Sequence, residues 1–223
     1  MNPMDWLPGR CLACDLPTPS GQGDLCVQCY GELPWCREVT EPIPGAALVL
    51  GALHYQGAIR DWIHRLKYHH GLAQGRVLGH ILRDAISAHY LPRSAQLGLP
   101  DHGLQRPQAL LPVPMPRSSW LRRGRNQASV LAGPVARALG IPIVHTLARR
   151  RRKQADQHTL SASERRALLA TAFELNGPPP DRIAIVDDVL TTGATCSALT
   201  SALLAAGARE VHVWCLAVTP APQ

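Results

Sequence analysis

Hydrophobic residues in this chain alternate between short continuous runs and helical stripes. Runs of strand length lie at residues 46–55, 109–115, 141–147, 172–175, 183–186 and 211–218. Between them, apolar side chains recur at the spacing of one helix face over residues 57–68, 77–90 and 127–139, and again after residue 195. Strands that alternate with helices predict an α/β fold with a mostly parallel sheet, whose ligands bind at the carboxyl ends of the strands.

The cysteines concentrate at the beginning of the chain, where five of the seven fall within residues 11–36. Four of them form two Cys-x-x-Cys pairs, Cys11 with Cys14 and Cys26 with Cys29. Two such pairs predict a tetrahedral four-thiolate shell for a structural Zn²⁺, which would supply the folding energy of a segment too short and polar to form a core. The alternatives are a redox-active motif or chance spacing, and Cys36 is either a free thiol or a substitute ligand.

Two domains are expected. Residues 41–45, Glu-Pro-Ile-Pro-Gly, have the composition of a linker. Residues 1–44 are therefore predicted to form an N-terminal zinc ribbon with four cysteine ligands, together with its linker, and residues 45–223 the α/β domain.

Charge and hydropathy limit which partners and which cellular location are expected. The net charge of +7 and the isoelectric point of about 9.4 suit an anionic partner, either a phosphate ligand or nucleic acid, although plain solubility explains them equally well. The first ten residues lack the pattern of a secretory signal, and no apolar run approaches the ~20 residues that span a bilayer. We therefore expect a cytoplasmic protein without membrane insertion, whose thiols stay reduced.

Residues 183–195 are the most informative stretch. An apolar run is followed by Asp187 and Asp188, then by a small, hydroxyl-rich turn, and then by a helix. The turn consists of Thr191, Thr192, Gly193, Ala194 and Thr195. Free N–H groups at a helix N-terminus favour a phosphate, hydroxyls add donors, and carboxylates accept hydrogen bonds from ribose hydroxyls directly or through Mg²⁺. This order predicts a sugar-phosphate site; the alternative is an ordinary strand–turn–helix with a solvated acidic pair.

The same stretch resembles the signature of the type I phosphoribosyltransferases, which bind phosphoribosyl pyrophosphate (PRPP). An apolar run, two acids, two apolar residues and Thr-Thr-Gly-Ala-Thr occur in the order of that signature. The fold that this resemblance implies is a type I phosphoribosyltransferase-like parallel sheet flanked by helices.

Over nearly its whole length the chain also resembles the competence protein F (ComF) family, including the gluconate-utilisation-like branch. Besides the PRPP-type string, the resemblance rests on four features in order. These are the two Cys-x-x-Cys pairs, Leu66-Lys67-Tyr68, Pro112-Val-Pro with Arg123-Gly-Arg-Asn-Gln127, and Gln157-x-x-Leu160-Ser161 with Arg165 and Ala172-Phe173.

These resemblances imply an activity and a set of roles. The activity is transfer of a phosphoribosyl group from PRPP, together with Mg²⁺, to an unknown nitrogen acceptor, with release of pyrophosphate. The implied catalytic residues are Asp187, Asp188, Arg152 and Lys153. The 5′-phosphate would bind to Thr191, Thr192, Gly193, Ala194 and Thr195. Candidates on the pyrophosphate side are Arg117, Arg122, Arg123 and Gln157, for which a solvated basic surface is the alternative.

Two other functions use the same features. The ComF resemblance implies a non-catalytic role in natural transformation, in which the chain binds incoming single-stranded DNA beside a competence helicase. Arginines, the zinc ribbon and tryptophans such as Trp120 are compatible with that role. Sensing of PRPP or a related nucleotide without turnover is the remaining possibility.

Overall fold

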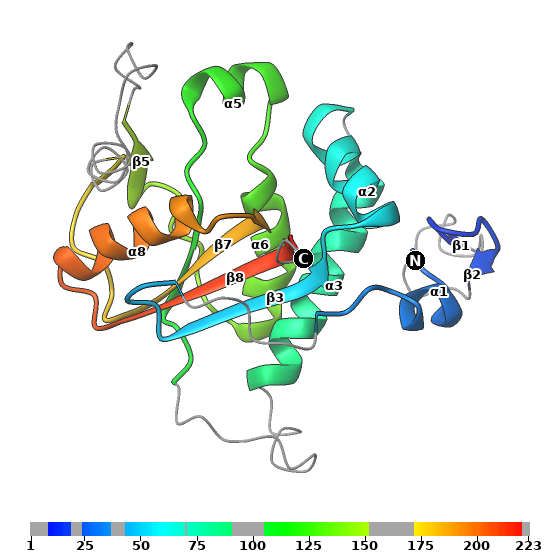
Figure 1. Ribbon diagram of the computed structural model, residues 1–223, viewed down its shortest axis with the longest axis horizontal. Helices are drawn as coiled ribbons and strands as arrows, with labels where there is room; N and C mark the ends of the chain where they lie inside the picture. Colours follow the sequence, from blue (N-terminus) through cyan, green and yellow to red (C-terminus); the bar gives the residue numbers. More distant parts are fainter. Residues whose placement is uncertain are drawn as a thin grey trace, which may run out of the picture.

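A four-stranded parallel sheet in the order β3-β8-β7-β4 lies at the centre of the protein (Figure 1). It consists of β3 (Leu48–His54), β4 (Ala109–Pro112), β7 (Arg182–Leu190) and β8 (Glu210–Val218). All three neighbouring pairs run parallel, as the sequence predicts. The structure is a computed structural model that describes residues 9–18, 24–36, 43–69, 71–90, 105–151 and 172–219.

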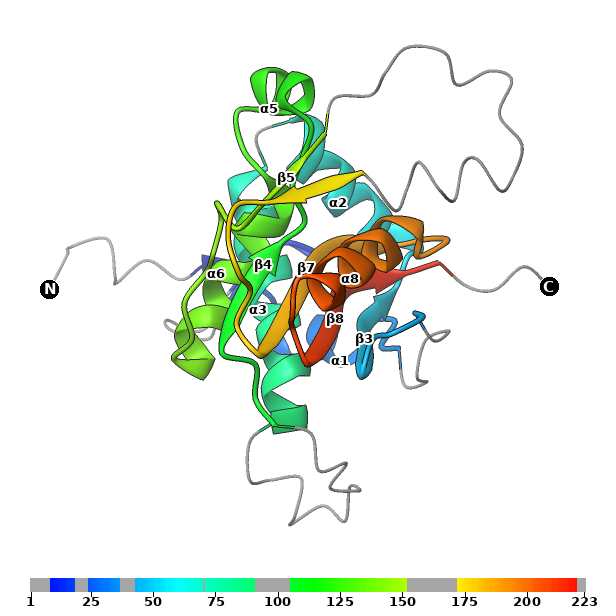
Figure 2. The same cartoon turned by 90° about the vertical axis from the view of Figure 1, so that its left-hand side faces the viewer.

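Helices cover both faces of this sheet. Figure 2 shows α8 (Ala194–Ala205) on one face, with α3 (Leu72–Tyr90) and α6 (Gln127–Leu139) on the other. The helix α2 (Gly57–Tyr68) packs into the same core as α3 and α6. Buried residues form two clusters, one on each side of the sheet, and consecutive residues of β7 alternate between them. Val186 packs with the α2, α3 and α6 side, whereas Ile185 packs with the α8 side.

The α3–α6 contact depends on two glycines of α3. An added Cβ at Gly75 would come within 3.0 Å of Leu66 and Val130, and one at Gly79 within 2.9 Å of the Pro134 ring. The two helices can therefore approach closely only because these positions lack a side chain. Gly75 also weakens the helical pattern of the sequence, and α3 begins at Leu72 instead of the predicted residue 77.

Several predicted elements differ from the structure. The predicted strand 141–147 is reduced to a bridge between Ile143 and Leu110, and Pro142, which lacks an N–H, contributes only its carbonyl, which accepts from Leu110 N at 2.9 Å. The strand predicted at 109–115 ends at Pro112, and α5 (Arg117–Arg123) occupies the expected basic loop. A separate antiparallel pair consists of β5 (Ala148–Arg150) and β6 (Phe173–Leu175).

The N-terminal segment contains β1 (Gly9–Arg10), β2 (Pro17–Thr18) and α1 (Val27–Gly31). It is attached to α3 at two points. The Arg76 guanidinium donates to both oxygens of Asp24, at 2.5 and 2.7 Å, and the Tyr30 hydroxyl donates to Asp84 at 3.0 Å. Within the described ranges, no helix is both long and apolar enough to cross a membrane.

The α3–α6 contact can be tested with matched glycine substitutions. Gly79→Ala is expected to lower the free energy of unfolding by ~1 kcal/mol, because the clash with the rigid Pro134 ring exceeds the gain in helix propensity. Gly31→Ala at the end of α1, where an added Cβ would meet no atom within 4 Å, should raise it by up to ~0.5 kcal/mol. Urea denaturation measures both changes. Stabilisation by both substitutions would contradict the close packing of α3 on α6.

Candidate active site at the carboxyl edge of the sheet

Both carboxylates of the predicted site lie inside β7. The strand continues past the predicted 183–186 run to Leu190, because β8 stays paired with it from Arg182 to Leu190. Neighbouring side chains of a regular strand point to opposite faces. Asp187 therefore faces α8, whose Cys196 thiol lies 3.8 Å from its Oδ2, and Asp188 faces α2.

Asp187 is held in a shielded position. Its Oδ1 accepts a hydrogen bond from the backbone N–H of Asp188 at 2.8 Å. Burial, followed by the negative charge of Asp188, raises the pKa of Asp187 to about 8. This shift favours the protonated form of the carboxyl group near neutral pH.

Asp188 forms an ion pair with Lys67, a residue that we did not predict for the site. The Lys67 ammonium group contacts Asp188 Oδ2, and the two side chains are only 23% and 15% exposed. Lys67 lies in the last turn of α2. The one signal in the sequence is the Leu66-Lys67-Tyr68 motif, which supported the family resemblance without indicating a role.

The predicted phosphate loop, residues 191–195, joins β7 to α8. Gly193 is the residue before the first turn of α8 and has φ +69°, a left-handed conformation that favours glycine. The N–H groups of the first helical turn have no partner within the helix, and Ser197 is the first residue to donate back, to the Gly193 carbonyl at 2.8 Å. The Thr191 and Thr192 side chains are exposed. This turn is suited to bind an anion.

The predicted pyrophosphate-side arginines lie on and at the end of α5, which projects at the top of Figure 1. The Arg123 guanidinium donates to the Tyr68 hydroxyl at 3.0 Å and lies 4.9 Å from the centre of its ring. Arg122 lies 5.8 Å from the same ring. Tyr68, another residue missed by sequence reasoning, follows Lys67 directly. Consecutive residues at the end of α2 thus contact the two groups, Lys67 the acidic pair and Tyr68 the arginine pair. Arg117 is exposed at the beginning of α5.

Other predicted residues lie apart from this cluster or outside the described ranges. Arg152, Lys153 and Gln157 fall in the segment 152–171, which the structure does not describe. A cleft of about 510 Å³ lies between the end of α2 and the beginning of α3, and it does not include the acidic pair or the phosphate loop. The residues that line it are Asp61, His64, Arg65, His69, Gly71 and Gln74.

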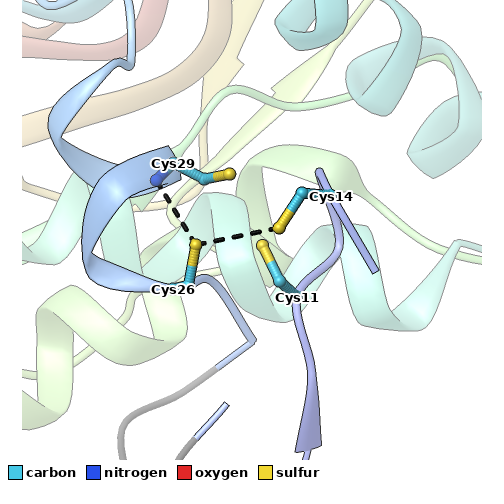
Figure 3. A group of neighbouring side chains, drawn as sticks. All are labelled: Cys11, Cys14, Cys26 and Cys29. Carbon is cyan, nitrogen blue, oxygen red and sulfur yellow. Dashed lines mark hydrogen bonds between the residues drawn. The ribbon is translucent and has the colours of Figure 1, made fainter. Parts of the chain in front are cut away.

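The four cysteines of the two Cys-x-x-Cys pairs form one cluster (Figure 3). All four sulfur atoms lie within 4.8 Å of one another, and Cys14 Sγ and Cys26 Sγ are 3.8 Å apart. A tetrahedron with Zn–S bonds of ~2.3 Å has edges of ~3.8 Å, so the cluster has the dimensions to hold a metal ion such as zinc.

The thiols of this cluster differ in acidity. Burial raises the pKa of Cys11. Backbone hydrogen bonds from Cys26 and Cys14 outweigh this effect and lower the pKa to about 6. Hydrogen bonding to Cys26 and Cys14 instead raises the pKa of Cys29 above its ordinary range. A divalent ion at the centre would offset the repulsion between the thiolates by attracting each of them. The four thiols could then all be deprotonated, as metal ligands must be.

Comparison with known proteins identifies the family of this chain. Residues 125–223 match the phosphoribosyl transferase domain family. Competence protein F from Haemophilus influenzae is 30% identical, with 96% of this chain and 99% of that protein covered. The chain belongs to the competence protein F family. Another ComF relative, DNA utilization protein YhgH from Escherichia coli, is 31% identical over 96% of this chain and 98% of its own length.

Among solved structures, a purine phosphoribosyltransferase from Pyrococcus horikoshii resembles this ComF protein at 19% identity and a TM-score of 0.34. The likeness covers 62% of this chain and 71% of the other.

The raised pKa of Asp187 predicts a pH-dependent cost to folding. The folded protein keeps this proton up to about pH 8, whereas an unfolded chain releases it near pH ~4. Stability therefore falls as the pH rises through this window. Asp187→Asn should raise the free energy of unfolding by at least ~1 kcal/mol at pH 8, and by less at pH 5.

Urea denaturation at both pH values measures the effect. Asp181→Asn is the matched control, because Asp181 is exposed and pairs with Arg209 at 3.6 Å before β7 begins. An equal gain from Asp187→Asn at both pH values would show that its stabilisation has another cause.

The cysteine cluster predicts a metal-dependent ribbon. Cys26→Ser should lose bound zinc and lower the thermal unfolding midpoint, because residues 9–36 contribute to the core through Cys11 and Leu25. Cys36→Ser is the matched control, since Cys36 lies outside the cluster, and it should retain about one zinc per chain. Elemental analysis and calorimetry measure both quantities. Loss of zinc from the Cys36 variant would instead make that residue a ligand.

Proposed function

We propose that this protein binds PRPP at the carboxyl edge of the sheet and transfers its phosphoribosyl group to a nitrogen acceptor. The observation that carries the proposal is the closeness of two kinds of group. Two carboxylates in β7 are followed, after a short turn, by the glycine-started N-terminus of α8. Acceptors for sugar hydroxyls therefore lie beside donors for a phosphate.

The 5′-phosphate would bind at the N-terminus of α8. Its oxygens would accept hydrogen bonds from the N–H groups of residues 195 and 196 and from the hydroxyls of Thr191, Thr192 and Thr195, whereas the N–H group of Ala194 already donates to Thr192 Oγ1 at 3.4 Å. The left-handed conformation of Gly193 turns these N–H groups toward the ligand.

The ribose would lie over the end of β7. The Asp188 Oδ1 atom accepts a hydrogen bond from a ribose hydroxyl while Oδ2 keeps its contact with Lys67. Asp187 supports the sugar from the α8 face. These contacts align C1 of the ribose with the acceptor.

Transfer then needs little covalent work from the protein. The acceptor nitrogen forms a bond to C1 and loses a proton, while the C1–O bond breaks and its electron pair leaves with pyrophosphate. Arg122 and Arg123, held beside the Tyr68 ring, would stabilise this developing negative charge, with Arg117 nearby on α5. Arg152, Lys153 and Gln157 remain proposed contributors to the leaving-group side.

Magnesium would arrive as part of the substrate. The pyrophosphate oxygens of PRPP are the hard donors that Mg²⁺ prefers. In the ligand-free protein, Lys67 occupies the Oδ2 side of Asp188, so the acidic pair is not open to a metal ion.

Zinc is proposed as a purely structural ion, held by Cys11, Cys14, Cys26 and Cys29. Four thiolates close the shell and leave no position for a substrate. We assign residues 1–44 to this ribbon and its linker, and residues 45–223 to the phosphoribosyltransferase-like domain.

A second candidate function is binding of single-stranded DNA during natural transformation, beside a helicase. The relatives named for competence and DNA utilization favour it, and so does α5. There, Trp120 is 53% exposed and Leu121 is 71% exposed, next to Arg122 and Arg123. An exposed aromatic ring among arginines suits stacked bases and phosphates.

Calorimetric titration of the zinc-loaded protein with PRPP, with and without Mg²⁺, tests the main proposal. The double variant Asp187→Asn with Asp188→Asn should weaken binding by a few kcal/mol, at ~1.5–3 kcal/mol for each charged hydrogen bond that is lost. Asp181→Asn, before the start of the same strand, is the control and should bind as the wild type does.

Two results would contradict this assignment. Undiminished binding by the double variant would remove the acidic pair from the site. Absence of PRPP binding, together with single-stranded DNA binding that falls steeply as salt rises, would favour the DNA-binding function.

A further inference from the structure

Lys67 holds an unusual position for a lysine. Its ammonium group lies against Asp188 Oδ2, an atom without solvent contact, and the aliphatic stem is largely covered. Exposed ion pairs contribute little because water screens them, but this pair is mostly shielded from water. The cation is therefore a persistent feature of the ligand-free site.

The rest of α2 holds Lys67 in this place. Ile63 and Leu66 are fully buried in the core below, so the rotation of the helix is fixed. Lys67 lies near the carboxyl end of α2, where the helix dipole favours a positive charge. The next residue, Tyr68, is itself held by Arg123.

A divalent ion at the acidic pair would have to displace this lysine. Mg²⁺ and Mn²⁺ require several oxygen ligands arranged as an octahedron. Within the part of the chain that the structure describes, the four cysteines are the only group of three or more His, Cys, Asp or Glu side chains close enough to hold a metal ion, so the acidic pair has no third such ligand. The Asp187 and Asp188 carboxyl groups interact with each other, and Lys67 contacts the Oδ2 atom of Asp188, where a metal ion would otherwise bind.

We propose that Lys67 is the resident cation of the acidic pair and excludes a divalent ion from Asp188 in the ligand-free protein. Lys67 acts as a positioning residue, because it holds Asp188 in one orientation toward the sugar. Its consequence for ligand binding rests on the proposed function: a metal ion enters this site only when it is bound to the pyrophosphate of PRPP.

Mn²⁺ titration of the ligand-free, zinc-loaded protein, followed by electron paramagnetic resonance, tests the proposal. Lys67→Met keeps the length of the stem and removes the charge. It should gain one Mn²⁺ site that is on the order of tenfold tighter than any site in the wild type. Adding Asp188→Asn to this variant should abolish the gained site, and Lys67→Arg should behave as the wild type does.

Arg60→Met is the matched control, because Arg60 is an exposed cation of the same helix and pairs with Asp61 at 3.8 Å. It should not gain the site. Lys67→Gln gives a second neutral variant if the methionine variant folds poorly, as judged by circular dichroism. Equal Mn²⁺ binding by the wild type and a folded neutral variant would overturn the role of Lys67.

A parallel PRPP titration separates this inference from the proposed function. A gained Mn²⁺ site in Lys67→Met without PRPP binding by the wild type would support the role of Lys67 and refute the PRPP site. PRPP binding by the wild type with no gained site would do the reverse.

Discussion

The regular pairing of β7 between β4 and β8 is the constraint on which the candidate site depends. Up to Val186 the strand is hydrogen-bonded on both sides, and beyond it the pairing continues with β8 alone, so the alternation of its side chains continues through Asp187 and Asp188. One carboxylate is therefore directed toward α8 and the other toward α2. The two carboxyl groups have different environments: Asp187 is shielded and has a raised pKa, whereas Asp188 is ion-paired with Lys67.

This arrangement explains which parts of the fold and site could be predicted from the sequence. The helices 57–68 and 127–139 were predicted with their observed bounds, because one face of each is buried and the period is clear. The beginning of α3 was missed because Gly75 interrupts the apolar stripe, and the strand at 141–147 was overestimated because Pro142 limits pairing.

The acidic pair and the cysteine cluster were visible in the sequence because each is local. Lys67 and Tyr68 were not, because they act on residues far along the chain, on β7 and α5. An ion pair between distant segments leaves no periodic signal in either one. Their role depends on how α2 packs over the carboxyl edge of the sheet, and that packing comes from the core residues below it.

The fixed rotation of α2 also limits how its length can vary. An inserted or deleted residue rotates everything that follows by about 100°, since an α-helix has 3.6 residues per turn. Such a change between Ile63 and Lys67 would leave Leu66 in the wrong place for the core or turn the ammonium group away from Asp188. The number of residues between the buried face of α2 and its carboxyl end is thus a property on which selection can act. This constraint does not depend on which residues occupy the intervening positions. Homologues that share this site should tolerate changes in sequence along the helix more readily than changes in its length.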